Sequence, residues 1–460
     1  MEDIANRVPG IEFIQADSRD AAVDLLEAQE FDLLICDLLI PPQSGGLDQD
    51  IDHGLFVYEH ARAESPGMPA LFLTGAGSYQ DVREALPARG RADLFGEGDP
   101  TNMVDLFFKD ERDAYVARIE MLAGRLAELE SSVVIDVISA GQPMLESELR
   151  TLKIFARRLN ASRMQVDELS GLSGSRALRL QLFDSADAHV AWVFAKVGIA
   201  SRIQNEKERT LAIHPRLTVG TYAPLLWEVD AGAGKRAALF FGNINQDDYP
   251  YTVFEWLQLE TDQSGFVGRI RELLGNMEAA KTSEVITIQE LRRLYITDEQ
   301  LETYLPRLGA SLCTDVEAKT IDAGQTMQHG DLHCCNIMVT TDGQPILIDF
   351  ERSGFLPMGL DPVVLEMSLL FHDKSPFRAD SWPSQEQCSQ WHDIEIYARE
   401  APLSDFVRAA RAWALDAAQT EQSFLALVYC HALRQLKYGD TNKERAIAIA
   451  QAAANRLVAT

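Results

Sequence analysis

The segment from Met327 to Glu351, MQHGDLHCCNIMVTTDGQPILIDFE, constrains the fold of this chain more than any other stretch. Its two apolar runs, IMV and PILI, are separated by the turn-forming residues TTDGQ, a pattern that predicts a β-hairpin. Asp331 and Asn336 precede the first strand, and Asp349 follows the second. Folding such a hairpin is expected to bring three oxygen-bearing side chains together.

These side chains suit the transfer of a phosphoryl group. That reaction needs a carboxylate to orient or deprotonate the acceptor, oxygen ligands for magnesium, and neutralisation of the phosphate charge. The hairpin can supply the carboxylate and the magnesium ligands. A single Asp at a strand end is more often a capping or turn residue, but the complete arrangement favours chemistry.

The motifs HGDLHCCN (329–336) and IDFE (348–351) resemble the catalytic loop and the metal loop of aminoglycoside phosphotransferase-like kinases. The resemblance implies an α+β, bilobal, protein-kinase-like phosphotransferase domain that uses ATP and Mg2+. It also implies that Asp331 is the catalytic base, that Asn336 is a magnesium ligand needed for catalysis, and that Asp349 is the principal magnesium ligand.

Other residues near these motifs have smaller expected roles. The resemblance implies that His329 positions the catalytic loop, and Asp361, ahead of VVLEMSLLF, resembles the carboxylate that steadies this loop from below. Glu351 stands where protein kinases carry Gly. Three further residues of the loop are expected to pack it rather than to bind a ligand: His333, Cys334 and Cys335.

The same resemblance implies a nucleotide-binding lobe upstream. Lys196, late in the strand-like run VAWVFAKV, would contact the α- and β-phosphates, and Glu206 on the next helix would hold it by an ion pair. Glu208 is a rival for that role. A small-residue turn between two strands would let backbone N–H groups approach phosphate oxygens, through Gly171, Ser173 and Gly174. Alternatively, Lys196 is a solvated lysine on an edge strand, Glu206 is an ordinary exposed charge on a helix, and the turn is a plain hairpin turn.

The first 110 residues alternate apolar runs with amphipathic segments. Strands are expected at 11–16, 31–40, 69–77 and 103–111, and helices at 21–29 and 54–64. Continuous apolar strands separated by helices predict a parallel sheet covered on both faces, whose ligands sit at the carboxyl ends of the strands. Asp37, Thr74 and Lys109 fall at such ends.

This N-terminal part resembles two-component receiver domains, which have a flavodoxin-like parallel sheet. By that resemblance Asp37 is the phospho-accepting aspartate, Thr74 the switch hydroxyl and Lys109 the phosphate-sensing lysine. The chain opens at what would be the second strand of a receiver, so we expect its first strand and acidic pair to be absent. The resemblance therefore implies a degenerate or truncated receiver, used for docking or regulation more than for phosphotransfer.

Four domains are predicted. An amphipathic helix from 112 to about 130, the boundary signal SAGQP at 139–143 and a second helix from about 146 to 159 separate the N-terminal part from the rest. We expect a receiver-like domain at 1–112, a helical connector at 113–160, a nucleotide lobe at 161–258 and a mostly helical catalytic lobe at 259–460.

Composition restricts the partners. A net charge of −28 argues against a general nucleic-acid binder, because such proteins need clustered Lys and Arg. The longest apolar runs are interrupted by Asp and are too short to span a bilayer, so we expect a cytoplasmic protein without a membrane partner. The six cysteines lack the spacing of a structural zinc site, and we expect them to be reduced.

The leading hypothesis is a kinase that moves the γ-phosphoryl group of ATP to a hydroxyl of a small molecule or protein, with a receiver-like domain for regulation or for docking a protein partner. One alternative is a nucleotide-binding pseudokinase that acts as a scaffold in a bacterial signalling or defence assembly. Another is a response-regulator output protein, in which phosphorylation of Asp37 gates the kinase part. No sequence code for the phosphoryl acceptor is recognisable.

Overall fold

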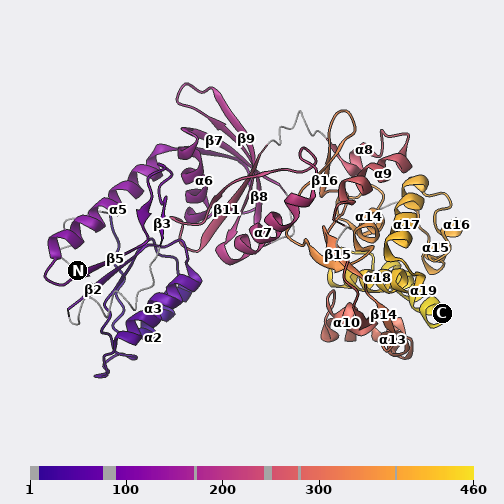
Figure 1. The fold of residues 1–460 in the computed structure, drawn as a ribbon, viewed down its shortest axis with the longest axis horizontal. Coiled ribbons are helices and arrows are strands. Elements are labelled where there is room, and N and C mark those ends of the chain that lie inside the picture. The colour runs from indigo at the N-terminus through magenta and orange to yellow at the C-terminus, as the bar shows by residue number, and fades with distance from the viewer. Residues whose placement is uncertain are drawn as a thin grey trace. The chain divides into compact units, whose positions relative to one another are not determined.

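The computed structural model of the chain describes residues 10–75, 90–169, 174–242, 251–277, 281–378 and 381–459 (Figure 1). The chain divides into two compact units. Unit 1 comprises Met1–Asn205 and Pro224–Ile244, and unit 2 comprises Glu206–Ala223 and Asn245–Thr460. Each unit has its own apolar core. Residues 206–223 and 245–258 of the predicted nucleotide lobe belong to unit 2, so the compact units and the four predicted domains divide the chain differently.

Unit 1 begins with a small parallel sheet. Its strands β1 (Leu34–Cys36), β2 (Ala70–Thr74) and β5 (Val104–Phe108) are ordered β1-β2-β5. Both strand pairings are parallel, with Leu34 opposite Ala70 and Ala70 opposite Val104. The predicted parallel sheet near the N-terminus is therefore confirmed.

Two helices accompany this sheet, α2 (Arg19–Ala28) and α3 (Ile51–Glu64). The hydroxyl of Ser18 caps α2 by accepting the N–H of Ala21. The predicted first strand at 11–16 is not formed: its backbone has no strand pairing with any other residue that the structure describes, although Ile11 and Phe13 pack against an apolar cluster of unit 1. A short antiparallel pair, β3 (Arg91–Ala92) with β4 (Thr101–Asn102), precedes β5.

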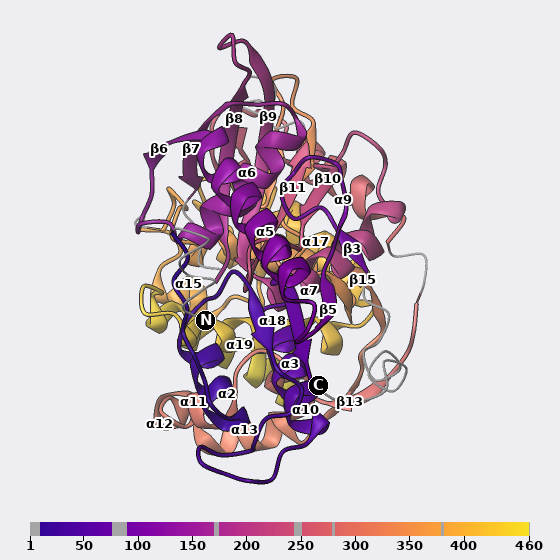
Figure 2. The ribbon, with the colours of Figure 1, turned by 90° about the vertical axis from the view of Figure 1, so that its left-hand side faces the viewer.

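A six-stranded sheet forms the second part of unit 1, in the order β10-β11-β9-β8-β7-β6. Its strands are β6 (Val134–Ser139), β7 (Arg163–Leu169), β8 (Arg176–Phe183), β9 (His189–Ile199), β10 (Leu225–Val229) and β11 (Arg236–Gly242). Along β8 alternate side chains are buried, as expected of a strand with one face against a core. Helix α6 (Glu146–Arg158) lies across that face (Figure 2). The rings of Phe155 and Phe240 stack with their centroids 3.8 Å apart.

The predicted connector at 113–160 is not purely helical. Its two predicted helices are present as α5 (Arg112–Ser132) and α6, but β6 lies between them and pairs parallel with β7. The run VVIDVIS at 133–139 is rich in β-branched residues, which favour strands. The connector therefore contributes an edge strand to the sheet.

Unit 2 is mostly helical, as predicted for the C-terminal half. Its longer helices are α9 (Gln263–Leu274), α13 (Ala310–Glu317), α14 (Leu360–Phe371), α17 (Ser404–Ala418), α18 (Glu421–Arg434) and α19 (Lys443–Ala459), and α7 (Ala200–Ile213) crosses the division between the units. The shorter ones are α8 (Val253–Trp256), α10 (Ile288–Arg293), α11 (Asp298–Glu302), α12 (Leu305–Leu308), α15 (Gln385–Ser389) and α16 (Ile394–Tyr397).

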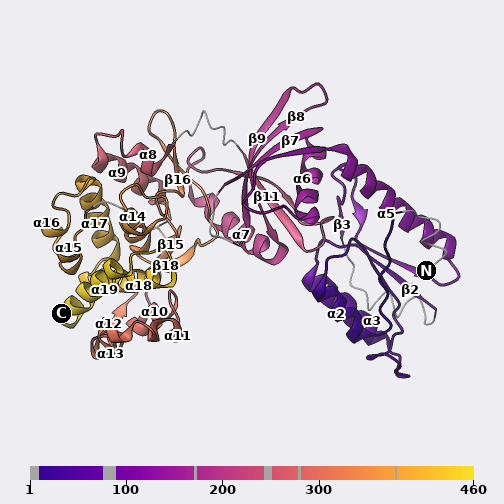
Figure 3. The ribbon, with the colours of Figure 1, turned by 180° about the vertical axis from the view of Figure 1, so that it is seen from behind.

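Every residue of α14 is buried, so this helix forms the centre of unit 2, with α17 packed alongside it (Figure 3). Gly359 starts the helix in the left-handed conformation, at φ 90°. Within the described ranges of the chain, no helix combines the length and the apolar character needed to cross a membrane.

The predicted hairpin is present. Strands β16 (Ile337–Val339) and β17 (Pro345–Leu347) pair antiparallel, and β12 (Tyr251–Thr252) adds a third strand beside β16. Gly343 adopts φ 81° in the turn, and a Cβ there would lie 2.7 Å from the Trp256 ring. Glycine therefore suits this turn for both its conformation and its size.

Two further strand pairs belong to unit 2. Strand β13 (Val285–Thr287) pairs antiparallel with β14 (Thr320–Asp322), and β15 (Gln325–Gln328) pairs antiparallel with β18 (Gly354–Pro357). The second pair matters for the site, because β15 leads into the HGDLHCCN motif and β18 follows the IDFE motif.

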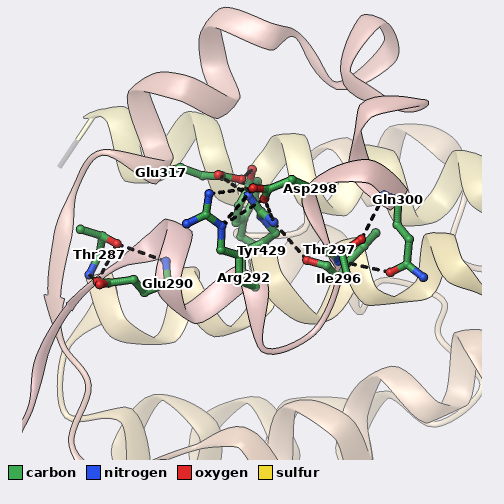
Figure 4. A network of polar contacts seen from close by, with 10 residues as sticks. Thr287, Glu290, Arg292, Ile296, Thr297, Asp298, Gln300, Glu317 and Tyr429 are labelled. Carbon is green, nitrogen blue, oxygen red and sulfur yellow. Dashed lines mark hydrogen bonds and ion pairs between the residues drawn. The ribbon is translucent and has the colours of Figure 1, made fainter.

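A buried polar network joins α10, α11, α13 and α18 (Figure 4). Nε and Nη2 of Arg292 donate to the two carboxylate oxygens of Glu317, at 3.0 and 2.8 Å. Nη1 of Arg292 donates to the carbonyl of Ile296 at 3.0 Å and lies 2.6 Å from Asp298. The Tyr429 hydroxyl donates to Glu317 at 3.2 Å. A buried arginine is stabilised when its donors are satisfied in this way.

Candidate active site

Two loops meet between two strand pairs of unit 2. We call residues 329–336, between β15 and β16, the first loop, and residues 348–353, between β17 and β18, the second loop. Because β15 pairs with β18 and β16 with β17, both loops lie between the same two ladders. The N–H of Ile348 donates to the carbonyl of Asn336 at 3.1 Å. Nε2 of His329 donates to the carbonyl of Ile348 at 2.9 Å.

The start of the first loop is held by α14. Asp361, in the first turn of this helix and 1% exposed, accepts the N–H groups of His329 and Gly330, each at 2.8 Å. Burial raises the pKa of Asp361, while His329 and the two N–H donors act in the opposite direction. Gly330 has φ 80°, and a Cβ there would lie 2.2 Å from the carbonyl oxygen of Arg352. The close approach of the two loops therefore requires glycine at position 330.

Asp331 follows Gly330 and lies between two arginines. Nη2 of Arg434 donates to Oδ1 of Asp331 at 3.1 Å, and Nε of Arg352 lies 3.4 Å from its Oδ2. Burial raises the pKa of Asp331, but the positive charge of Arg434, together with His333 and Arg352, outweighs it and lowers the pKa to about 2. Asp331 is therefore ionised at neutral pH.

Neither arginine was predicted from the sequence. Arg434 lies near the end of α18, 103 residues from Asp331, and no local pattern points to it. Arg352 directly follows the IDFE motif and belongs to the second loop, a position in the sequence that could have suggested a role.

Asn336 and Asp349 offer oxygen atoms from the two loops. Nδ2 of Asn336 donates to the backbone carbonyl of Asp331 at 2.9 Å, which fixes the side-chain amide. Asp349 adopts φ 65°, a left-handed conformation that Asp tolerates better than most residues. Its Oδ1 accepts the N–H of Glu351 at 3.4 Å. An amide oxygen and a carboxylate suit a hard divalent cation such as Mg2+, so the donors present here fit the implied cofactor.

The other side chains of the first loop differ in their surroundings. Cys334 is fully buried, and its sulfur accepts the Ser368 hydroxyl at 3.1 Å. Burial lowers the pKa of His333 to about 4, so its ring is neutral at pH 7. The ring centroids of His333 and His372 are 4.4 Å apart.

Lys196, expected to bind nucleotide, lies on β9, between β8 and β11 in the six-stranded sheet. It is 2% exposed, which excludes a solvated edge-strand lysine. Glu206 is 1% exposed whereas Glu208 is exposed, which favours Glu206 over Glu208 as the partner of a buried cation. Lys196 and Glu206 belong to different compact units, and their ion pair stays a prediction.

The predicted phosphate-binding turn lies partly outside the described residues, since these exclude Gly171 and Ser173. Gly174 is exposed just before β8, and a Cβ there would lie 1.8 Å from Nη1 of Arg202. The guanidinium of Arg202 therefore occupies the space beside Gly174.

The three residues of the receiver-like site come together in unit 1. Nζ of Lys109 lies 2.6 Å from Oδ2 of Asp37 and donates to it. The N–H of Lys109 donates to the carbonyl of Thr74 at 3.0 Å, and Thr74 is 1% exposed. Asp37 and Lys109 directly follow β1 and β5, so both stand at carboxyl ends of the sheet, as predicted.

Comparison with known proteins identifies the region that carries both loops. Residues 255–403 match the family model described as the phosphotransferase enzyme family. This region is a phosphotransferase-family domain. It includes Asp331, Asn336, Asp349 and Asp361, and the predicted enzyme class is thereby confirmed. No curated protein sequence matches the chain.

Several solved structures of kinases are also similar to the chain. A thermostable mutant of aminoglycoside phosphotransferase APH(4)-Ia has 12% identity and a TM-score of 0.38, with 64% of this chain and 94% of that chain covered. Aminoglycoside-3'-phosphotransferase of type VIII has 15% identity and a TM-score of 0.37, with 64% and 99% covered. Ethanolamine kinase of Plasmodium vivax has 10% identity and a TM-score of 0.33, with 75% and 89% covered.

Other structures of the APH(4)-Ia enzyme that are similar to the chain hold ADP or AMP-PNP with hygromycin B. Nothing in these comparisons identifies a receiver domain in the N-terminal part of the chain.

Proposed function

We propose that the chain is an ATP-dependent kinase that transfers the γ-phosphoryl group to a hydroxyl of a small molecule or a protein. The observation that carries this proposal is the meeting of the two loops within the phosphotransferase-family domain, with Asp331, Asn336 and Asp349 on them. Bound magnesium and ATP would supply the transferable phosphoryl group and part of the charge neutralisation.

The residues of the chain then have distinct proposed tasks. Asp331 accepts a hydrogen bond from the acceptor hydroxyl and orients it for in-line attack. It would take the hydroxyl proton as the acceptor oxygen bonds to the γ-phosphorus and ADP leaves with the bridging oxygen. Asn336 and Asp349 hold Mg2+ through their side-chain oxygens. His329 joins the two loops through its bond to Ile348, so it acts as a positioning residue.

A nucleotide-binding site that includes Lys196 completes the proposal. Lys196 contacts phosphate oxygens, Glu206 holds Lys196, and the turn at 171–174 approaches the phosphates through backbone N–H groups. The burial of both Lys196 and Glu206 supports these roles, because buried charges require partners.

A transfer assay with the full chain tests the proposed function. The protein is incubated with labelled ATP or GTP, Mg2+ and pooled acceptors (aminoglycosides, amino sugars, choline-like amines, nucleosides and protein extracts), and labelled products are separated by mass. Transfer of the labelled phosphoryl group to one of the pools would support the proposed kinase activity. Nucleotide binding without transfer to any pool, together with intact folding, would instead favour the pseudokinase scaffold.

Replacing Arg434 with Gln should introduce a dependence of turnover on acidic pH. Arg434 is the largest of the influences that lower the pKa of Asp331, and burial raises that pKa once Arg434 is removed. The turnover of the variant should then fall more than that of the natural chain as the pH is lowered from about 8 to about 5, because the loss of Arg434 raises the pKa of Asp331. In the natural chain Asp331 stays ionised throughout this range.

The control for this prediction is Arg352→Gln. Arg352 is 53% exposed and contributes less than Arg434 to the pKa of Asp331, so its loss should change the pH profile less. The measurement is the rate of transfer as a function of pH, at matched ionic strength, for the natural chain, Arg434→Gln and Arg352→Gln. Identical profiles for the natural chain and Arg434→Gln would rule out this account of Asp331.

We further propose that the N-terminal sheet is a receiver-like module that docks a protein partner without accepting phosphate. The pairing of Asp37 with Lys109 supports the receiver-like site. In the described parts of the chain, no group of three metal-binding side chains includes Asp37. A receiver needs Mg2+ to accept phosphate, so this arrangement favours docking or regulation.

Incubation with acetyl phosphate and Mg2+, followed by intact-mass measurement, should therefore show no phosphoryl adduct on the full chain. The matched variant is Asp37→Asn, which removes the acceptor carboxylate. An adduct that forms on the natural chain and is lost in Asp37→Asn would support the gating alternative and contradict our proposal.

A further inference from the structure

We propose that His333, Cys335 and His372 form a binding site for a thiophilic divalent cation of the Zn2+ class. One potential ligand atom from each residue lies within 4.8 Å of the other two. His333 and Cys335 belong to the first loop, and His372 directly follows α14. Over the described ranges, this is the one group of three or more His, Cys, Asp and Glu side chains that gathers so closely.

The contacts between the three side chains support a shared ligand. Sγ of Cys335 lies 3.9 Å from Nδ1 of His372, and the rings of His333 and His372 are 4.4 Å apart between centroids. Nδ1 of His333 is buried and has no hydrogen-bond partner among the residues that the structure describes. A buried polar atom without a partner costs free energy, and this cost would be relieved if binding of the cation re-oriented the ring.

The donor chemistry selects the kind of cation. Two imidazole nitrogens and one thiolate are ligands that zinc prefers, and three protein ligands leave a fourth position open. Zn–N and Zn–S bonds of about 2.0 and 2.3 Å place donor atoms about 3.5 Å apart, so the donor atoms of this group would have to approach one another by at most about 1 Å. All three residues are half-buried, which gives an ion access. The Cys335 thiol loses its proton to solvent when the sulfur binds the metal.

An ion at this site would tie the first loop to the end of α14. His333 and Cys335 stand between Asp331 and Asn336, and the N–H of Asn336 donates to the carbonyl of His333 at 2.8 Å. The ion would therefore restrain the loop that carries two of the proposed active-site residues. The site differs from the proposed magnesium site, because Asn336 and Asp349 offer only oxygen atoms.

Cys334 provides a matched control because it neighbours Cys335 but is fully buried against α14. Its sulfur accepts the hydroxyl of Ser368 at 3.1 Å. It lies outside the proposed ligand group. Metal binding at the proposed site should therefore require Cys335 and should not change when Cys334 is replaced conservatively.

The experiment uses the reduced full chain and two probes. Titration with Co2+ is followed by the near-ultraviolet charge-transfer absorption of a cobalt–thiolate bond, and Zn2+ content is measured by elemental mass spectrometry after gel filtration. The natural chain and Cys334→Ser should each bind one ion with this absorption. Cys335→Ser should lose the absorption, and Cys335→Ser and His372→Gln should each weaken Zn2+ binding by about a hundredfold.

Three results would overturn the proposal: a natural chain that retains no Zn2+, an absorption that persists in Cys335→Ser, or one that disappears in Cys334→Ser while circular dichroism shows native folding. The readout is metal binding and needs no phosphoryl acceptor. A failure here therefore leaves the proposed kinase activity untouched, and a failure of the kinase assay leaves the metal site standing.

Discussion

Replacing Asp331 with Asn should lower phosphoryl transfer by about a hundredfold or more, the usual contribution of a positioned general base. The change keeps the size of the side chain but removes the negative charge that faces Arg434 and Arg352. The amide can no longer accept the acceptor's proton. Because the amide of Asn does not ionise, raising the pH should not rescue the variant.

The measurement is the initial rate of transfer at saturating MgATP, together with the affinity for a non-hydrolysable ATP analogue. The turnover should fall while the analogue still binds, because the proposed nucleotide contacts come from other residues. Asp342→Asn is the matched control: Asp342 is an exposed carboxylate in the turn of the same hairpin, and its loss should leave the rate nearly unchanged.

A near-normal rate for Asp331→Asn would refute the assignment of Asp331 as the base. Equal losses in Asp331→Asn and Asp342→Asn would show that the hairpin responds to any lost carboxylate, which would remove the specific role of Asp331 as well.

Replacing Arg411 with Met should destabilise unit 2 by about 3–5 kcal/mol, the usual cost of leaving one member of a buried ion pair alone. Nε and Nη2 of Arg411, on α17, donate to the two carboxylate oxygens of Glu366, on α14, at 2.8 and 2.6 Å. Both side chains are less than 5% exposed. Met fills the volume of the arginine but leaves the Glu366 carboxylate buried without its cation.

Trp391 makes this pair unusually costly to break. The guanidinium carbon of Arg411 lies 3.7 Å from the centre of the Trp391 ring, and Nη1 donates to the Trp391 carbonyl at 3.0 Å. The indole N–H of Trp391 donates to Glu366 at 3.3 Å. One substitution therefore removes an ion pair, a cation–π contact and a backbone hydrogen bond at the centre of unit 2.

Thermal unfolding followed by circular dichroism should show a midpoint for unit 2 lower by on the order of 10 °C. The control is Arg408→Met, three residues earlier on α17. Arg408 pairs with Glu395 at the surface, where an ion pair contributes little, so the midpoint should hardly move. Similar midpoints for Arg411→Met and the natural chain would contradict the stabilising role of the buried pair.

The sequence predicted the local elements of the fold well. The hairpin 337–347, the two helices of the connector and the parallel N-terminal sheet are all present, because turn residues and apolar periodicity act over short distances. The strand β6 was missed, and the strand expected at 11–16 does not form. A strand forms only where a neighbouring strand is available to pair with it, and short segments do not encode that neighbour.

Sequence alone determined the identity and order of the residues on the two loops, since HGDLHCCN and IDFE are contiguous motifs around one hairpin. Only the tertiary structure decided their surroundings. Arg434 reaches Asp331 across 103 residues, Asp361 binds the start of the first loop, and His372 joins two loop residues at the proposed metal site. The charge around a residue, its burial and the geometry of its ligands depend on which distant segments of the chain lie next to it, and only the folded structure shows this.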